Sequence, residues 1–174
     1  MRVALKLHPD CRCDAVRSIE VDVTRARDGI DLRYRAVGTI ANLLIPKPIG
    51  FQRANELWRH TCFEAFIRVP GSTAYREFNF APSGGWAAYA FDSYRCGVRN
   101  VDVWHLSLIA DPAGDDAYEL AITLGPETDL NRPWQLGLSA VIEETSGRKS
   151  YWALAHPQGK PDFHHPDGFQ LTLG

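Results

Sequence analysis

The sequence has no segment that would hold it in a membrane. None of its apolar runs approaches the roughly 20 residues that a transmembrane helix needs, and the N-terminal residues MRVALKLHPD lack the apolar core and cleavage site of a secretory signal. The formal charge is −2 and no lysine- or arginine-rich run stands out, so the basic surface expected of a nucleic-acid-binding protein is missing. We therefore expect a cytoplasmic protein with no membrane or nucleic-acid partner.

The common catalytic and cofactor-binding motifs are also missing. The chain contains no GxxxxGK[ST], GxGxxG, GxSxG or HExxH pattern. Cys62 follows His60 by two residues, but two such side chains in a strand do not converge on one substrate atom, so Cys62 is assigned to packing. We predict no catalytic residue and no cofactor.

Cysteine is scarce, and its pattern carries little chemistry. The four cysteines lack the secretory context that would favour disulfides. Cys11 and Cys13, close to His8, form a C-x-C pattern without the second ligand pair of a zinc site. Free thiols are expected, with Cys62 as a small buried apolar side chain.

Alternation of apolar and polar residues with a period of two runs through most of the chain, which is typical of β-strands. The segments that show it are 3–8, 18–24, 30–39, 61–69, 74–81, 86–91, 104–110, 118–124, 137–144, 150–155 and 169–173. Turn signals such as Asp28-Gly29 and Gly71-Ser72 separate them. The spacing predicts one all-β domain over residues 1–174, folded as a two-sheet antiparallel β-sandwich of the immunoglobulin-like or jelly-roll-like kind.

The stretch from Leu57 to Arg95 is the centre of the chain and predicts three consecutive strands. If the period of two holds throughout, Glu64, Glu77, Asn79 and Trp86 share one sheet face, opposite the phenylalanines of the second strand. Acidic side chains among aromatic ones on a sheet face are unusual for a solvated surface, so this face is expected to line a pocket.

The runs LWRHTCFEAFIR, YREFNFAPSG and WAAYAFDSYR, together with SYWALAHPQGKPDFHHPDGFQLTL near the C-terminus, resemble the DOMON-like domain proteins, relatives in fold of the family 9 carbohydrate-binding modules. The resemblance covers most of the chain. It implies an immunoglobulin-like β-sandwich that binds a small ligand, which is a sugar or haem in the better understood members. The haem-binding branch uses Met and His as axial ligands, and Met1 is the sole methionine here, which ranks haem lowest.

Aromatic and hydrogen-bonding residues have the composition of a small-ligand pocket. Indole rings stack on the apolar face of a sugar while charged and amide groups bind its hydroxyls. We predict a non-catalytic domain that binds a carbohydrate or sugar derivative. The predicted ligand-binding residues are Trp58, Arg59, His60, Glu64, Glu77, Asn79, Trp86, Arg95, Trp152, His156 and His164.

Two alternatives stay open. Glu64 and Glu77 could be the acid and base of an enzyme that acts on a sugar-like ligand, with histidines assisting, or they could be structural carboxylates that hold Arg59 or Arg95.

The segment HPQGKPDFHH could bind a divalent metal through His156, Asp162 and one of His164 and His165. It could equally be a polar loop at the rim of the domain.

Overall fold

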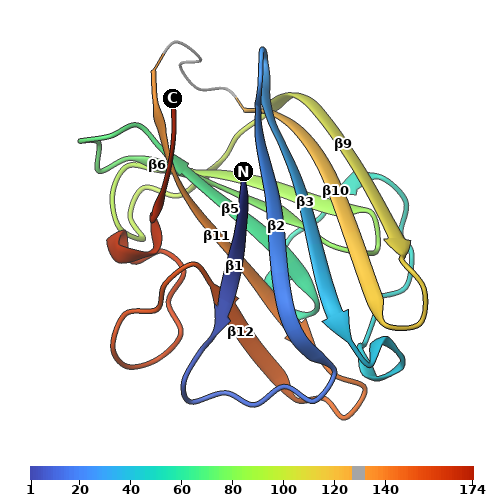
Figure 1. The fold of residues 1–174 in the computed structure, drawn as a ribbon. Helices are drawn as coiled ribbons and strands as arrows, with labels where there is room; N and C mark the ends of the chain where they lie inside the picture. The colour runs from blue at the N-terminus through green and yellow to red at the C-terminus, as the bar shows by residue number, and fades with distance from the viewer. Residues whose placement is uncertain (127–131) are drawn as a thin grey trace.

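The computed structural model describes residues 1–126 and 132–174, and these form an all-β fold (Figure 1). Three single turns of 3-10 helix, η1 (Ile40–Asn42), η2 (Leu57–Arg59) and η3 (Pro166–Gly168), lie between strands. Among the described residues no helix has the length and apolar character to span a bilayer. The strands are β1 (Arg2–Leu7), β2 (Val16–Ala26), β3 (Gly29–Gly38), β4 (Gln52–Arg53), β5 (Cys62–Arg68), β6 (Tyr75–Phe80), β7 (Gly85–Phe91), β8 (Arg99–Asn100), β9 (Val103–Pro112), β10 (Ala117–Pro126), β11 (Trp134–Glu143), β12 (Lys149–Ala153) and β13 (Leu171–Leu173).

The strands follow one hydrogen-bonded path rather than two separate sheets. The order is β4-β7-β6-β5-β11-β12-β1-β2-β3-β10-β9, with β13 beside β11 and β8 beside β7. The first strand joins the two arms of this path, because its residues 2–5 pair with β2 while Lys6 and Leu7 pair with β12. The resulting sheet curls like half of a barrel (Figure 1). The all-β prediction is confirmed, whereas the division into two sheets is not.

Most strands lie where the alternation of residues predicts them. All eleven segments that show the period of two overlap observed strands, and a turn of helix forms at Leu57–Arg59 just before the central strands. The sequence pattern missed β4 and β8, which have two residues each. A pair of residues is too short to show an alternation.

The main core fills the space between the two arms. Phe63, Phe78 and Phe80 from β5 and β6 pack in one cluster with residues such as Ile19 and Leu32 from β2 and β3. Buried Tyr34 of β3 donates its hydroxyl across this core to the backbone carbonyl of Glu64, at 2.7 Å. The opposite face of β5, β6 and β7 is therefore turned away from the main core.

The face of Trp86 differs from the prediction. Glu64 and Glu77 do share a face with Asn79, which lies opposite Glu64 in the register, so this part is confirmed. Trp86, however, lies opposite Phe80 and belongs to the core face. The number of residues in the turn between β6 and β7 sets which face each residue of β7 joins, and a period of two counted within strands does not supply it.

Candidate functional site

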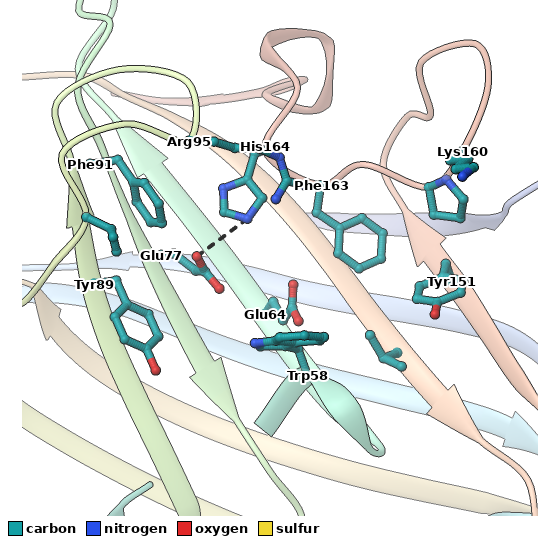
Figure 2. Close-up of a pocket in the computed structure, with 13 residues that line it drawn as sticks. Trp58, Glu64, Glu77, Tyr89, Phe91, Arg95, Tyr151, Lys160, Phe163 and His164 are labelled. Carbon is teal, nitrogen blue, oxygen red and sulfur yellow. Dashed lines mark ion pairs between the residues drawn. The ribbon is translucent and has the colours of Figure 1, made fainter. Parts of the chain in front are cut away.

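A cavity of about 610 Å³ lies over the face of β5, β6 and β7 that is turned away from the main core (Figure 2). Strand residues form its floor, and the segments 92–98 and 154–165 supply the side chains around them. The lining residues are Trp58, Glu64, Glu77, Tyr89, Phe91, Arg95, Val98, Val141, Tyr151, Lys160, Pro161, Phe163 and His164. The lining is thus mostly aromatic and apolar, with a few ionisable groups, as in many small-molecule sites.

Two buried glutamates form the polar part of the floor, in the middle of the side chains in Figure 2. Glu64 on β5 accepts one hydrogen bond to its carboxyl group, from the Ser139 hydroxyl at 3.2 Å. Glu77 on β6 accepts one from the Asn79 side-chain amide at 2.8 Å. Its other oxygen lies 3.7 Å from Nε2 of His164, beyond hydrogen-bonding distance. Each carboxyl group therefore has donors for only a fraction of its lone pairs.

This environment disfavours the charged form of both acids. Burial raises the pKa of Glu64 well above its usual range, and repulsion from Glu77 adds to the rise while Ser139 opposes it. Burial likewise raises the pKa of Glu77, against the Asn79 hydrogen bond and the positive charge of Arg95. The floor therefore takes up protons more readily than ordinary carboxylates do.

His164 stands above the floor as a neutral ring. Burial lowers its pKa to about 4, and the charge of Arg95 contributes. Its Nδ1 lies 2.8 Å from the hydroxyl of Tyr75, which also accepts a hydrogen bond from the backbone N–H of Arg95 at 3.2 Å. All three groups are satisfied when Tyr75 donates to Nδ1, which places the ring proton on Nε2, facing Glu77.

Arg95 is held in an uncommon backbone conformation at the edge of the cavity. Its φ of 53° lies in the left-handed region that a non-glycine residue rarely adopts. The backbone N–H of Arg95 donates a hydrogen bond to the Tyr75 hydroxyl. The carboxylate of Asp162 accepts one hydrogen bond from the guanidinium of Arg95 at 2.8 Å and one from the Tyr94 hydroxyl at 2.6 Å. These contacts join the segments 92–98 and 154–165 and fix the charge of Arg95 beside the cavity.

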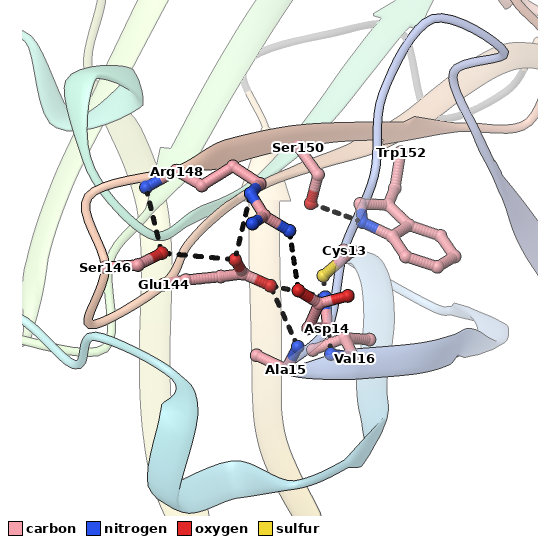
Figure 3. A network of polar contacts seen from close by, with 9 residues as sticks. All are labelled: Cys13, Asp14, Ala15, Val16, Glu144, Ser146, Arg148, Ser150 and Trp152. Carbon is pink, nitrogen blue, oxygen red and sulfur yellow. Dashed lines mark hydrogen bonds and ion pairs between the residues drawn. The ribbon is translucent and has the colours of Figure 1, made fainter.

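A third buried glutamate, outside the cavity, has the partners that the floor lacks (Figure 3). The carboxylate of Glu144 accepts the backbone N–H of Ala15 at 2.9 Å and that of Asp14, and Arg148 lies 3.6 Å away. Burial opposes the charge of Glu144, but these hydrogen bonds and Arg148 outweigh it and lower its pKa. Glu144 thus anchors the chain before β2 to the turn between β11 and β12.

Five of the predicted site residues meet at the cavity: Trp58, Glu64, Glu77, Arg95 and His164. Asn79 does not line it but hydrogen-bonds Glu77 from the same sheet face. Trp58 is 49% exposed, so its indole is available to a ligand at the mouth. The predicted residues thus include both acids of the floor and three of the side chains around them.

Arg59 and His60 follow Trp58 in the chain but lie outside the cavity lining. Arg59 pairs with Glu56 at 2.7 Å, and His60 lies 2.6 Å from Glu143. The alternative that Arg59 or Arg95 holds Glu64 or Glu77 is wrong, because these arginines pair with Glu56 and Asp162.

Trp86, Trp152 and His156 are also outside the cavity lining. Both tryptophans pack against the main core, and the indole N–H of Trp152 donates to Ser150 at 3.1 Å. His156 contacts the backbone carbonyl of Lys6 at 2.8 Å. A tryptophan or histidine in a strand pattern does not by itself reveal which face it joins.

Several lining residues escaped the sequence prediction. The register of β7 would have identified Tyr89 and Phe91, because Tyr89 lies opposite Glu77. Val141 and Tyr151, which lie opposite each other on β11 and β12, required knowledge of which strands neighbour β5. For Lys160, Pro161 and Phe163, in an irregular segment, no local signal exists.

The metal alternatives find no supporting arrangement. Within residues 1–126 and 132–174, no group of three or more His, Cys, Asp or Glu side chains is placed to hold a metal ion. The four cysteines are free thiols and Cys62 is buried. Asp162, part of the suggested loop site, accepts hydrogen bonds from Tyr94 and Arg95.

Comparisons with known proteins relate the chain to others through its fold. No family model and no curated protein matches it. A candidate carbohydrate-binding protein from Bacteroides uniformis superposes with a TM-score of 0.65 and 13% identity, over 87% of this chain and 76% of that one. A family 9 carbohydrate-binding module from Caldicellulosiruptor kristjanssonii, in complex with glucose, superposes with a TM-score of 0.50 and 9% identity, over 82% of this chain and 69% of that one. The same module in complex with cellotriose matches with the same score and identity, over 67% of its length. The chain therefore shares the fold of these proteins.

Proposed function

We propose that this chain is a DOMON-like, non-catalytic carbohydrate-binding domain and that its ligand occupies the cavity over β5, β6 and β7. The observation that carries the proposal is the pair of buried carboxyl groups, each with one hydrogen bond from the protein, on a floor surrounded by aromatic side chains. Sugar hydroxyls donate and accept hydrogen bonds, and the C–H faces of a sugar ring pack on aromatic rings. The likeness in fold to proteins seen with glucose and cellotriose supports the same ligand class.

The raised pKa values of both carboxyl groups favour binding over turnover. A pair of catalytic carboxyls needs one acid and one base, and enzymes separate the two pKa values by giving them different surroundings. Here burial raises the pKa of both acids, that of Glu64 further than that of Glu77. Neither acid therefore has the lowered pKa that would keep a base ionised.

Tryptophan fluorescence and calorimetry with glucose and cellotriose test the proposal. Removal of the Trp58 indole should weaken binding about tenfold, which corresponds to about 1.4 kcal/mol of lost stacking and burial. Trp104→Ala is the matched control, because Trp104 is 69% exposed on β9 and does not line the cavity. The proposal fails if neither sugar binds, or if Trp58→Ala and Trp104→Ala weaken binding equally. Product release from a sugar substrate, lost in Glu64→Gln, would instead establish the enzyme.

A further inference from the structure

The cavity floor has an excess of hydrogen-bond acceptors. The carboxyl groups of Glu64 and Glu77 receive one hydrogen bond each, both from neutral groups. Asn79 uses its amide N–H toward Glu77, and its buried Oδ1 has no partner among the residues that the structure describes. Ionised, the floor would offer five oxygen atoms and two protein donors. A ligand rich in donors would balance this arrangement.

Among residues 1–126 and 132–174, no cationic side chain lies within hydrogen-bonding distance of the two carboxyl groups. The acids are buried, and the nearest imidazole, His164, is neutral at physiological pH because burial lowers its pKa to about 4. Arg95 is bound to Asp162, and Lys160 is exposed on the segment 154–165. Paired buried carboxyl groups without a cation within hydrogen-bonding distance are costly to keep ionised.

Aromatic rings surround the two acids. Tyr89 and Phe91 come from β7, Phe163 from the segment 154–165 and Trp58 from η2, and all line the same cavity (Figure 2). The faces of such rings attract a positive charge, and the attraction grows when the charge is removed from water. Carboxyl groups within an aromatic enclosure are thus suited to a cation that carries apolar surface.

We propose that the preferred ligand is an amino sugar whose ammonium group sits on the floor between Glu64 and Glu77, among the aromatic side chains. This inference rests on the proposed function. An ammonium group supplies three donors and no acceptor, which matches the excess of acceptors. The sugar ring then packs against the aromatic walls, and its hydroxyls face the outer part of the cavity.

The distribution of charge orients such a ligand. The acids lie on the strands, whereas Arg95 and Lys160 belong to the two segments beside the sheet. The other titratable side chains that line the cavity are Tyr89, Tyr151 and His164. An ammonium group is therefore attracted toward the strands and repelled from the segments, while hydroxyl or ether oxygens accept hydrogen bonds from Arg95 and Lys160.

Binding should release protons. In the empty cavity burial favours the protonated carboxyl groups, and an ammonium group beside them favours ionisation. Each carboxyl group that ionises loses its O–H proton to the buffer. A neutral sugar brings no charge and should release fewer protons.

Calorimetry with glucosamine, N-acetylglucosamine and glucose at slightly acidic pH tests this proposal in wild-type protein. Glucosamine should bind at least tenfold more tightly than N-acetylglucosamine, which carries no ammonium group. Titrations in buffers of different ionisation enthalpy should show more protons released with glucosamine than with either neutral sugar. If the neutral sugars bind as tightly as glucosamine, the amine preference is wrong and the proposed function stands. If none of the three binds, the amine preference is wrong, and the titration with cellotriose then decides the proposed function.

The variants Glu64→Gln and Glu77→Gln test the role of the acids. Each should reduce the affinity ratio of glucosamine to N-acetylglucosamine toward one and reduce proton release, because one of the two acids remains. Glu56→Gln is the control, because Glu56 is exposed, pairs with Arg59 and does not line the cavity. A ratio that survives in both floor variants overturns the proposal. Circular dichroism identifies a variant that fails to fold. In that case the proton release measured with glucosamine in the wild-type protein decides whether the acids bind the ammonium group.

Discussion

The exposed fractions of Glu64 and Glu144 are nearly the same, 2% and 4%, but Glu64 lies deep in the protein and Glu144 lies near its surface, and their surroundings act in opposite directions. Glu144 accepts two backbone N–H groups and lies beside Arg148, so its pKa is lowered. Glu64 accepts one serine hydroxyl, faces a second acid, and has a raised pKa. The exposed fraction of a carboxyl group therefore does not separate a structural carboxylate from one in a binding site. The depth of the group and the hydrogen-bond donors that the protein supplies do separate them.

The largest effect should appear in the pH dependence of stability, because two carboxyl groups of the floor titrate. Their folded pKa values are raised, so their contribution to stability is full below the ordinary carboxyl pKa of 4.5 and is lost as pH rises through the folded values. The double variant Glu64→Gln/Glu77→Gln should remove this decline. Urea denaturation at a series of pH values measures this fall in stability. A fall of equal size in the double variant would show that Glu64 and Glu77 do not cause it.

Glu144 should behave in the opposite way. Its folded pKa is lowered, so its contribution is present above the ordinary carboxyl pKa of 4.5 and is lost as pH falls through the folded value. At neutral pH, Glu144→Gln should cost about 2 kcal/mol, because it removes charge-assisted hydrogen bonds from the backbone N–H groups of Asp14 and Ala15. Glu64→Gln is the matched variant and should cost less than about 1 kcal/mol or stabilise the protein. Chemical denaturation measures both losses of stability. If Glu144→Gln and Glu64→Gln lose the same free energy of unfolding, the distinction between the two sites is wrong.

The smallest effect concerns the serines beside each acid. Ser139→Ala removes the one hydrogen bond to the carboxyl group of Glu64, so it should raise the pKa of Glu64 further and cost about 1 kcal/mol. Ser146→Ala removes a contact of 3.3 Å to Glu144, which keeps its backbone donors, and should cost less than about 0.5 kcal/mol. Carbon-detected NMR titration and urea denaturation measure both quantities. A larger loss in Ser146→Ala would contradict this ranking.

The positions of the strands could be predicted because alternation is a local property of the chain. The same argument placed Glu64 and Glu77 on one face, and the register between β5 and β6 agrees with it. It failed at Trp86, because the register across the turn after Phe80 puts Trp86 opposite Phe80, and a count within the strands does not supply that register. Local pattern thus predicts the elements and part of their register.

The other half of the site depends on contacts between distant residues. Arg95 is positioned by Asp162, and Phe163 and His164 reach the cavity because the segment 154–165 is tied to the segment 92–98. Trp152 and His156 have the residue types of a binding site but face the core or the backbone of β1. Residue type identifies candidates, and only the tertiary arrangement selects among them.

The double pairing of β1 has a consequence for synthesis of the chain. Lys6 pairs with Ala153, so the ribosome must make all the strands from β2 to β11 before the second partner of β1 exists. At 5 to 20 residues per second, the delay is on the order of 10 seconds. During this time Lys6 and Leu7 keep their β12-facing backbone groups exposed, although β2 can already pair with residues 2–5. The join between the two arms of the sheet therefore begins with the pairing of β1 and β2 and is completed only after β12 has been made.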